Sequence, residues 1–381
     1  MTGTASVAAE TLPTVTASAP AKTNLVLHVG TPTADGYHPL ETLFVAVDLR
    51  ETVSVSLDPS LARRGSGVVV TVEPAPGSAY ERMVEEGTVR LADIPLDEGN
   101  LAVRAALAVC AELGVPVPGL RLHLRKAVPV AGGMGGGSAD AAAALVAVNA
   151  LLASHLGVPG LTTEDLHRLG ATLGADVPFM LFGGAAIGRG TGTELEPVSV
   201  HGRLHFVFVP QDQGLSTPAV YRQWDAAHTV VNAAARAAGD DDAAPPAPGG
   251  AHLPGDAPSP ANKTLPATPH QQPSPGTAPD PVPAEVLDAL NHGDAPRLAT
   301  LVRNDLQAPA IHLLPELETL LDHGVELGAV VGWVSGSGPT VCFLAASAED
   351  AQALVGAFGR ERRRALAVTA PVPGARVESG A

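Results

Sequence analysis

The chain has few cysteines and few basic residues for its length. Only two of its 381 residues are cysteine, and both lie inside apolar runs, at Cys110 and Cys342. Two such thiols do not make a disulfide framework, and they favour a reducing, cytoplasmic compartment. Acidic residues outnumber lysine and arginine 39 to 23, which gives a formal net charge of −16. That charge argues against generic binding to nucleic acid or to an anionic membrane surface.

The sequence also lacks the long apolar segments of exported and membrane proteins. Its first 20 residues contain no lysine, no arginine and no apolar run, so we expect no secretory signal. The longest uncharged stretch follows Asp140, but Asn149 interrupts it and Gly157 ends it, so we expect no membrane span. With 45% hydrophobic residues, the chain is long enough for two domains with cores of their own.

A glycine-rich stretch at 129–144, PVAGGMGGGSADAAAA, is the most informative part of the chain. An alternating strand pattern at 120–124 precedes it, and an alanine-rich helical pattern at 141–153 follows. Ser138 is a good helix N-cap, and the glycines let backbone N–H groups close on a ligand. A strand, a glycine loop and a helix N-terminus in this order favour the binding of an anion such as phosphate.

The stretch matches neither of two common nucleotide-binding motifs. A P-loop needs lysine after its last glycine, whereas Gly137 is followed by Ser138 and Ala139. A dinucleotide fingerprint starting at Gly133 would need a glycine at 138 and an acidic residue about 20 positions later, and both are missing. A flexible turn remains as an alternative, although such turns seldom have a capped helix directly behind them.

Strand and helix patterns are mixed along the chain without strict alternation, which predicts an α+β fold. For example, residues 41–57 predict two strands. We expect a disordered tail at 1–18, a first domain at 19–193, a second domain at 194–372 and a tail at 373–381. Residues 239–283 hold 13 of the 35 prolines and no aromatic residue, so we expect a disordered insertion there.

Three further features suggest a phosphoryl-transfer site. A second glycine loop lies at 335–339, Lys22 opens a strand pattern, and Asp176 stands just before Val177 and a proline. Phosphoryl transfer needs phosphate positioning, charge neutralisation and often a carboxylate that accepts the proton of the attacking hydroxyl. Taken singly, Asp176 is equally typical of a turn after a helix, and Lys22 is more typical of a surface residue than of a catalytic one.

Together the motifs resemble the GHMP small-molecule kinases. The glycine stretch resembles their phosphate-binding motif, and SGSGPT at 335–340 resembles their third motif. PAKTNLVLHV at 20–29, DGYH at 35–38 and LGADVPF at 173–179 resemble the members that phosphorylate cytidine diphosphate-linked methylerythritol in the non-mevalonate isoprenoid pathway. The resemblance covers nearly all of the chain outside the proline-rich insertion and the two tails.

The resemblance implies a two-domain fold with the active site in the cleft between the domains. Lys22 and Asp176 match the catalytic pair of the family. Asp176 would take the proton from the 2-hydroxyl of the acceptor, and Lys22 would favour the ionised carboxylate. ATP would be the phosphoryl donor, with magnesium as expected for ATP, although no acidic metal ligand can be assigned.

The resemblance also implies binding residues. Those on the nucleotide side are Asn100, Lys126, Pro129, Ala131, Gly132, Gly133, Met134, Gly135, Gly136, Gly137 and Ser138. Those for the small-molecule acceptor are Asn24, Tyr37, His38, Thr217 and Tyr221. Tyr37 and His38 match the cytosine-recognition residues, and Tyr221 matches a second aromatic that stacks on the base, worth about 1–3 kcal/mol. The alternative for Tyr221 is a half-buried helix residue beside Trp224.

Other hypotheses stay open. The chain could be another GHMP kinase, for a mevalonate, homoserine or sugar acceptor, or a non-catalytic nucleotide-binding protein with a disordered interaction arm. Two positions depart from the family pattern: Met134 replaces the usual leucine, and Thr33 stands where many members have arginine. The sequence does not separate a monomer from a homodimer.

Overall fold

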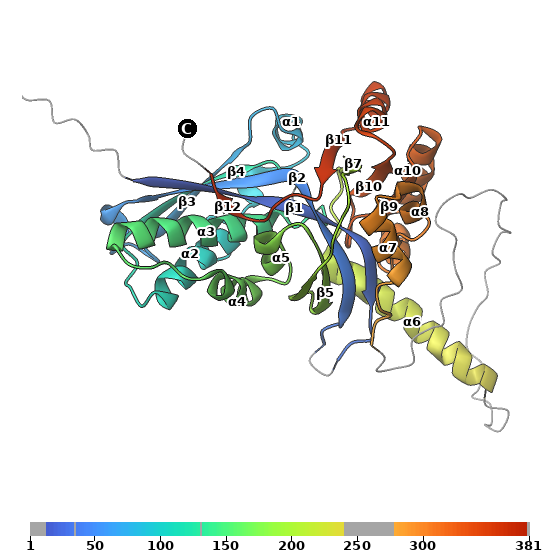
Figure 1. Cartoon of the computed structure of the whole chain (residues 1–381), viewed down its shortest axis with the longest axis horizontal. Helices are drawn as coiled ribbons and strands as arrows, with labels where there is room; N and C mark the ends of the chain where they lie inside the picture. Colours follow the sequence, from blue (N-terminus) through green and yellow to red (C-terminus); the bar gives the residue numbers. More distant parts are fainter. Residues whose placement is uncertain (1–12, 34–35, 130–131, 240–277, 379–381) are drawn as a thin grey trace, which may run out of the picture.

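Two sheets organise the chain, and the computed structural model describes residues 13–33, 36–129, 132–239 and 278–378 (Figure 1). The first sheet is built on two long antiparallel strands, β1 (Thr14–Val29) and β2 (Leu40–Leu57). Its strand order is β12-β1-β2-β4-β3, while β5 and β6 extend it beyond β2 and β8 pairs with β1. The remaining strands of this sheet are β3 (Val68–Pro74), β4 (Leu120–Lys126), β5 (Ala185–Gly190), β6 (Glu194–Pro197), β8 (Arg303–Asn304) and β12 (Arg376–Val377).

Helices cover one face of the first sheet (Figure 1). The central one, α3 (Gly136–Leu156), has 21 residues, long and apolar enough to cross a bilayer by composition, contrary to the sequence-based expectation. However, 61% of its most apolar window is buried inside the protein, because α3 packs against β1, β2 and its neighbouring helices. The others in this layer are α2 (Leu101–Glu112), α4 (Thr163–Leu173) and α5 (Val177–Phe182); α1 (Ala79–Glu85) and the short 3-10 helices Pro59–Leu61 and Leu91–Asp93 lie in connections.

The second sheet has the order β11-β7-β10-β9 and is buried on both faces. Side chains alternate along β7, so Phe206 and Phe208 enter one core cluster while Val207 and Val209 enter another. Its strands are β7 (Leu204–Val209), β9 (Val331–Val334), β10 (Val341–Ala345) and β11 (Leu366–Ala370). Its helices are α6 (Thr217–Gly239), α7 (Ala284–His292), α8 (Ala295–Ala299), α9 (Gln307–Leu313), α10 (Glu316–Glu326) and α11 (Ala348–Arg360).

The structure corrects the prediction of two strands at 41–57, because β2 runs through this segment as one strand. The pairing with β1 shifts register between Pro20 and Ala21, so Asp48 and Leu49 are accommodated without ending the strand. A second shift follows between Asn24 and Val26. The two irregularities bracket the part of β1 that carries Lys22.

The predicted tails are also corrected where the structure describes them. Residues 14–18 belong to β1, and β12 pairs with the same part of β1. Arg50 holds the C-terminal segment in place, since its guanidinium donates to the carbonyls of Pro373 (2.9 Å) and Gly374 (2.8 Å). Ala375 N–H donates to the Met180 carbonyl at 2.8 Å, so the segment also supports α5.

The expected domain boundaries and insertion are only partly covered by described residues. The first sheet continues past 193 through β6, and the second begins with β7. Most of the proline-rich segment, 240–277, lies outside the described residues. Its end is ordered, because Val282 enters a core cluster and the Asp280 carbonyl is hydrogen-bonded to His28 Nδ1 at 2.7 Å.

Candidate functional site

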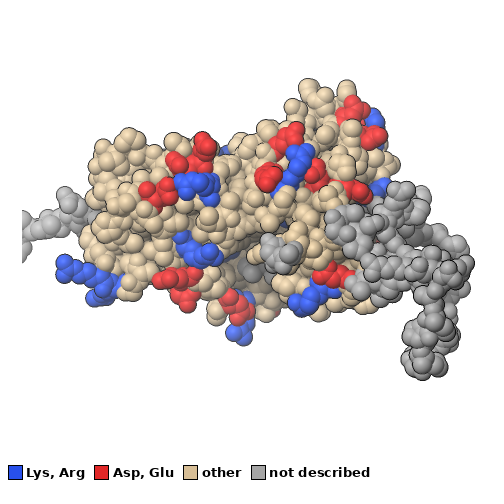
Figure 2. Space-filling model, turned by 90° about the horizontal axis from the view of Figure 1, so that it is seen from below, with Lys and Arg blue, Asp and Glu red and all other residues tan. Residues whose placement is uncertain are grey.

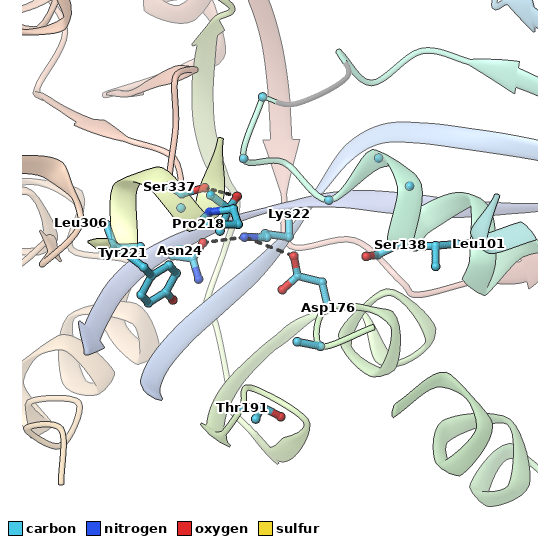
Figure 3. A pocket seen from close by; sticks show the side chains of 18 of the residues that line it. Lys22, Asn24, Leu101, Ser138, Asp176, Thr191, Pro218, Tyr221, Leu306 and Ser337 are labelled. Carbon is cyan, nitrogen blue, oxygen red and sulfur yellow. Dashed lines mark hydrogen bonds and ion pairs between the residues drawn. The ribbon is translucent and has the colours of Figure 1, made fainter. Parts of the chain in front are cut away.

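A cavity of about 890 Å³ opens where the glycine stretch, β1 and α6 meet (Figure 3). Residues from both halves of the chain line it, including Lys22 from β1, Asp176 before α5 and Tyr221 from α6. Figure 2 shows acidic and basic side chains interspersed over one face of the protein, so the net charge is not gathered into one patch there.

The glycine stretch forms the wall at the start of α3. Gly135 is the N-cap, with left-handed φ 73° and ψ 28°, and a Cβ there would lie 2.3 Å from Met180 Cε. Ser138 is thus the third residue of the helix and not its N-cap, contrary to the prediction. The first N–H groups of a helix have no partner within it, and the helix dipole adds positive charge at that end. Gly136, Gly137 and Ser138 line the cavity there, so this wall suits phosphate.

The second glycine loop packs directly on the first. Gly336 has φ 57°, and a Cβ on it would lie 3.1 Å from the Gly133 carbonyl and 3.2 Å from Lys22 Nζ. Asn304 fixes this loop by donating to the carbonyls of Val334 and Gly336, both at 2.7 Å. Two glycine motifs that lie far apart in the sequence therefore meet beside Lys22.

Lys22 and Asp176 form an ion pair on the wall of the cavity, with 3.6 Å between Nζ and Oδ2 (Figure 3). Lys22 Nζ also donates to Asn24 Oδ1 at 2.9 Å, and Asn24 Nδ2 donates to Thr42 Oγ1 at 2.7 Å. The backbone N–H of Lys22 donates to the Met134 carbonyl at 3.1 Å, which ties β1 to the glycine stretch. The ammonium is thus fixed by its neighbours, while Asp176 keeps part of its carboxylate open to the cavity.

The Lys126 ammonium is already paired with carboxyl groups, unlike that of a lysine that is free to bind phosphate. Its Nζ lies between Glu51 Oε1 (2.6 Å) and Asp140 Oδ2 (2.5 Å), and all three side chains are almost fully buried. Burial raises the pKa of Glu51 to about 8, although the Lys126 ammonium works against that shift. Burial likewise raises the pKa of Asp140. Glu51 Oε2 accepts from Ala127 N–H at 2.8 Å, so this trio joins β2, β4 and the start of α3 beneath the glycine stretch.

Aromatic and imidazole rings gather at the far end of the cavity. The ring centroid of His38 lies 4.9 Å from that of Tyr221 and 5.4 Å from that of Trp224, the latter edge-on at 89°. Tyr37 stands at the rim with 65% of its surface exposed. Burial, and to a smaller degree the charge of Asp176, raises the pKa of Tyr221, so its hydroxyl stays neutral.

The structure brings nearly all of the predicted site residues to this one cavity. Sixteen of the eighteen line it: Lys22, Asn24, Tyr37, His38, Asn100, Lys126, Pro129, Gly132, Gly133, Gly135, Gly136, Gly137, Ser138, Asp176, Thr217 and Tyr221. Met134 is the exception, since its side chain is buried in a core cluster. Ala131 lies outside the described residues, as does Asp35 of the DGYH turn. The individual binding roles remain predictions.

Several residues of the site were missed from the sequence. Thr42 and Asn304 hold other site residues, while Arg222 and Asp225 line the cavity from α6. None of them belongs to a short motif, so only their helical spacing from Tyr221 could have pointed to the last two. The described part of the chain contains no group of three or more His, Cys, Asp or Glu able to hold a metal ion.

Comparison with known proteins assigns the family. The sequence matches the GHMP kinases N terminal domain over residues 100–184 and the GHMP kinases C terminal domain over 286–363. It is 39% identical to the 4-diphosphocytidyl-2-C-methyl-D-erythritol kinase of Arthrobacter sp. (strain FB24) over 368 residues, covering 96% of this chain and 95% of that protein. The enzyme of the same name from Thermobifida fusca (strain YX) is 40% identical over 365 residues, covering 95% and 98%.

Solved structures agree with this assignment and confirm the predicted α+β fold. A crystal structure of 4-(cytidine 5'-diphospho)-2C-methyl-D-erythritol kinase matches with a TM-score of 0.61 and 28% identity, covering 94% of this chain and 99% of that one. A homoserine kinase from Cytophaga hutchinsonii shares the fold, with a TM-score of 0.60 at 17% identity, covering 98% and 100%. The chain belongs to the GHMP kinase family and, within it, to the 4-diphosphocytidyl-2-C-methyl-D-erythritol kinases.

Proposed function

We propose that this enzyme transfers the γ-phosphoryl group of ATP to the 2-hydroxyl of 4-diphosphocytidyl-2-C-methyl-D-erythritol, with Asp176 as the general base. The observation that carries the proposal is the Lys22–Asp176 pair, 3.6 Å apart, on the wall of the cavity that the glycine stretch also lines. A carboxylate within reach of a bound hydroxyl can accept its proton as the oxygen attacks phosphorus. The bond from phosphorus to the bridging oxygen of ADP then breaks, and ADP leaves.

Lys22 has two roles in this proposal. Its ammonium is close enough to Asp176 to favour the ionised carboxylate, which is the form that accepts a proton. It also stands beside Gly336 and Gly135, where it could stabilise the charge that develops on the transferring phosphoryl group. Because Asn24 holds the ammonium in place, it can serve both purposes without reorganising.

The donor nucleotide fits the glycine wall. Backbone N–H groups at the start of α3 would bind the phosphates of ATP. A Cβ at Gly133 would collide with Ser335 of the second glycine loop, and one at Gly135 with Met180, so a side chain at either position would displace this wall. Magnesium would be held mainly by phosphate oxygens and water, which is its usual manner of binding in kinases. Asn100 and Lys126 line the same cavity, and on this proposal they would lie on its nucleotide side.

The acceptor would extend from the catalytic pair to the aromatic end of the cavity. All five predicted acceptor residues line the cavity. Asn24 and Thr217 would lie near the reacting hydroxyl, and Tyr37, His38 and Tyr221 would hold the cytosine. Two free, buried cysteines fit a cytoplasmic enzyme. We expect it to act as a monomer or homodimer on this small molecule, without a nucleic-acid or membrane partner.

A coupled assay of ADP release tests the function. We expect turnover with the cytidine diphosphate-linked methylerythritol and none with mevalonate, homoserine or a sugar. Asp176→Asn should lower kcat by about 10²–10⁴-fold while ATP binding persists. Asp322→Asn on α10, which does not line the cavity, is the control and should keep full activity. Full activity of the Asp176 variant would exclude the proton-acceptor role, and turnover with another acceptor alone would exclude the substrate.

A further inference from the structure

His38 is held in one orientation at the aromatic end of the cavity. Its Nε2 lies 2.8 Å from Asp225 Oδ1, and only 9% of its side chain is exposed. Tyr221 and Trp224 pack against the same ring, and His228 stacks on Trp224 at a centroid distance of 3.8 Å. Because three sides of the ring are occupied, the remaining nitrogen has a fixed direction.

The contact with Asp225 determines which nitrogen carries the proton. An ionised carboxylate can only accept hydrogen bonds, so the Nε2 that faces it must be the donor. In the neutral imidazole the other nitrogen, Nδ1, then carries a lone pair and accepts. No hydrogen bond to His38 Nδ1 occurs within the described ranges, and this atom is not among the fully buried unpartnered ones. Since His38 lines the cavity, Nδ1 is available to a ligand there.

We infer that Asp225 is a positioning residue that makes His38 an acceptor toward the substrate base and so selects an aminopyrimidine over an oxopyrimidine. Cytosine carries an exocyclic amino group, which donates, at the position where uracil carries a carbonyl oxygen, which only accepts. An acceptor on the protein therefore pairs with the first and repels the second. The inference rests on the proposed function, and it names the residue that sets the choice of base.

The placement of Asp225 on α6 supports this role. Thr217, Tyr221 and Asp225 follow one another at four-residue intervals, so they lie on one face of the helix, and all three line the cavity. Thr217 is next to Ser337, at 2.8 Å between the two hydroxyl oxygens, on the side of the catalytic pair. The same helix face thus runs from the reacting end of the cavity to its base-binding end. Asp225 lies at the base-binding end.

Binding of CDP and UDP, measured by calorimetry, tests the inference without relying on turnover. The wild type should bind CDP at least about tenfold more tightly than UDP, because an unpaired polar group in the site penalises the wrong base. Asp225→Asn has the same shape, but its amide can also donate to Nε2 and so permits the opposite tautomer. We expect its CDP/UDP preference to fall toward one, with KM for ATP unchanged. Gln223→Ala, on α6 but away from the cavity lining, should keep the wild-type preference.

Nitrogen-15 NMR of the histidine rings gives a second readout. The wild type should show His38 protonated at Nε2 and unprotonated at Nδ1, whereas Asp225→Asn should show a mixture. A purely structural Asp225 would weaken CDP and UDP binding equally, and that result, or a wild-type ring protonated at Nδ1, would overturn the inference. A CDP preference that depends on Asp225 in an enzyme without kinase turnover would support the inference and refute only the proposed function.

Discussion

A Cβ atom on Gly133 would lie 2.1 Å from the carbonyl oxygen of Ser335. The two glycine loops therefore touch backbone to backbone, although they lie far apart in the sequence. Gly133 also has φ +73°, a backbone conformation that residues with a Cβ atom rarely adopt. This contact sets the position of the phosphate-binding wall relative to the loop beside Lys22.

Gly133→Ala should therefore disrupt the site by forcing the two loops apart. We expect KM for ATP to rise and kcat to fall, together by at least about 10²-fold, because misplacement by 1 Å can cost that much. Gly77→Ala is a matched control, since Gly77 has the same φ of 73° but no atom within 4 Å of an added Cβ. It should keep full activity and lose only about 1–2 kcal/mol of stability. Equal kinetic losses in both variants would contradict the steric argument.

Lys126 places an ammonium between two buried carboxyl groups, those of Glu51 and Asp140. Lys126→Met should lower the free energy of unfolding by about 3–5 kcal/mol, since it leaves the buried Asp140 carboxylate without its partner. Urea denaturation measures this change. The control is Arg121→Met, which removes a partly exposed pair with Asp58 and should cost less than about 1 kcal/mol. A similarly small loss for Lys126→Met would show that the buried carboxylates need no ammonium.

The buried position of Glu51 predicts a specific pH dependence of stability. Its pKa is raised from 4.5 to about 8 in the folded protein, so folding binds a proton between these values. The contribution of Glu51 should therefore fall as pH rises through this window, by up to about 1.4 kcal/mol per pH unit. Glu51→Gln cannot ionise and should lack this contribution. The stability difference, wild type minus Glu51→Gln, should decrease between pH 5 and pH 8; a constant difference would refute the prediction.

Arg222 is a third cation of the cavity lining, besides Lys22 and Lys126. Both lysines face carboxylates, whereas Arg222 has no ion pair within the described parts of the chain. It lies one residue after Tyr221 on α6, between the reacting end and the base-binding end. On the proposed function, its guanidinium is suited to the diphosphate of the acceptor.

Arg222→Gln should raise KM for the cytidine diphosphate-linked acceptor by about tenfold or more, which corresponds to the loss of one charge-assisted hydrogen bond. KM for ATP should stay unchanged, because the donor phosphates bind at α3. Steady-state kinetics with each substrate varied in turn measures both constants. Arg363→Gln, an exposed arginine outside the cavity lining, should behave as the wild type. A rise in KM for ATP alone would place Arg222 at the donor instead.

The sequence by itself determined the parts of the site that short motifs carry. The glycine stretch, Lys22 and Asp176 stand in local patterns whose chemistry is readable without a fold, and the structure brings them to one cavity. Predictions from short sequence patterns were wrong at two places. Ser138 is a good N-cap by residue type, but the left-handed Gly135 begins the helix earlier. Residues 41–57 predict two strands, yet the shift of register between β1 and β2 lets β2 continue past Asp48 and Leu49.

Only the tertiary structure determined which side chains pair with one another in the site. Asp225 reaches His38 across 187 residues of sequence, and Glu51 reaches the Ala127 N–H across 76. Each is a single polar residue in an otherwise ordinary strand or helix, so no local pattern distinguishes it from a solvated side chain. The reason is physical: a hydrogen bond or an ion pair depends on distance and burial, and strand pairing and helix packing bring together residues that the sequence keeps far apart.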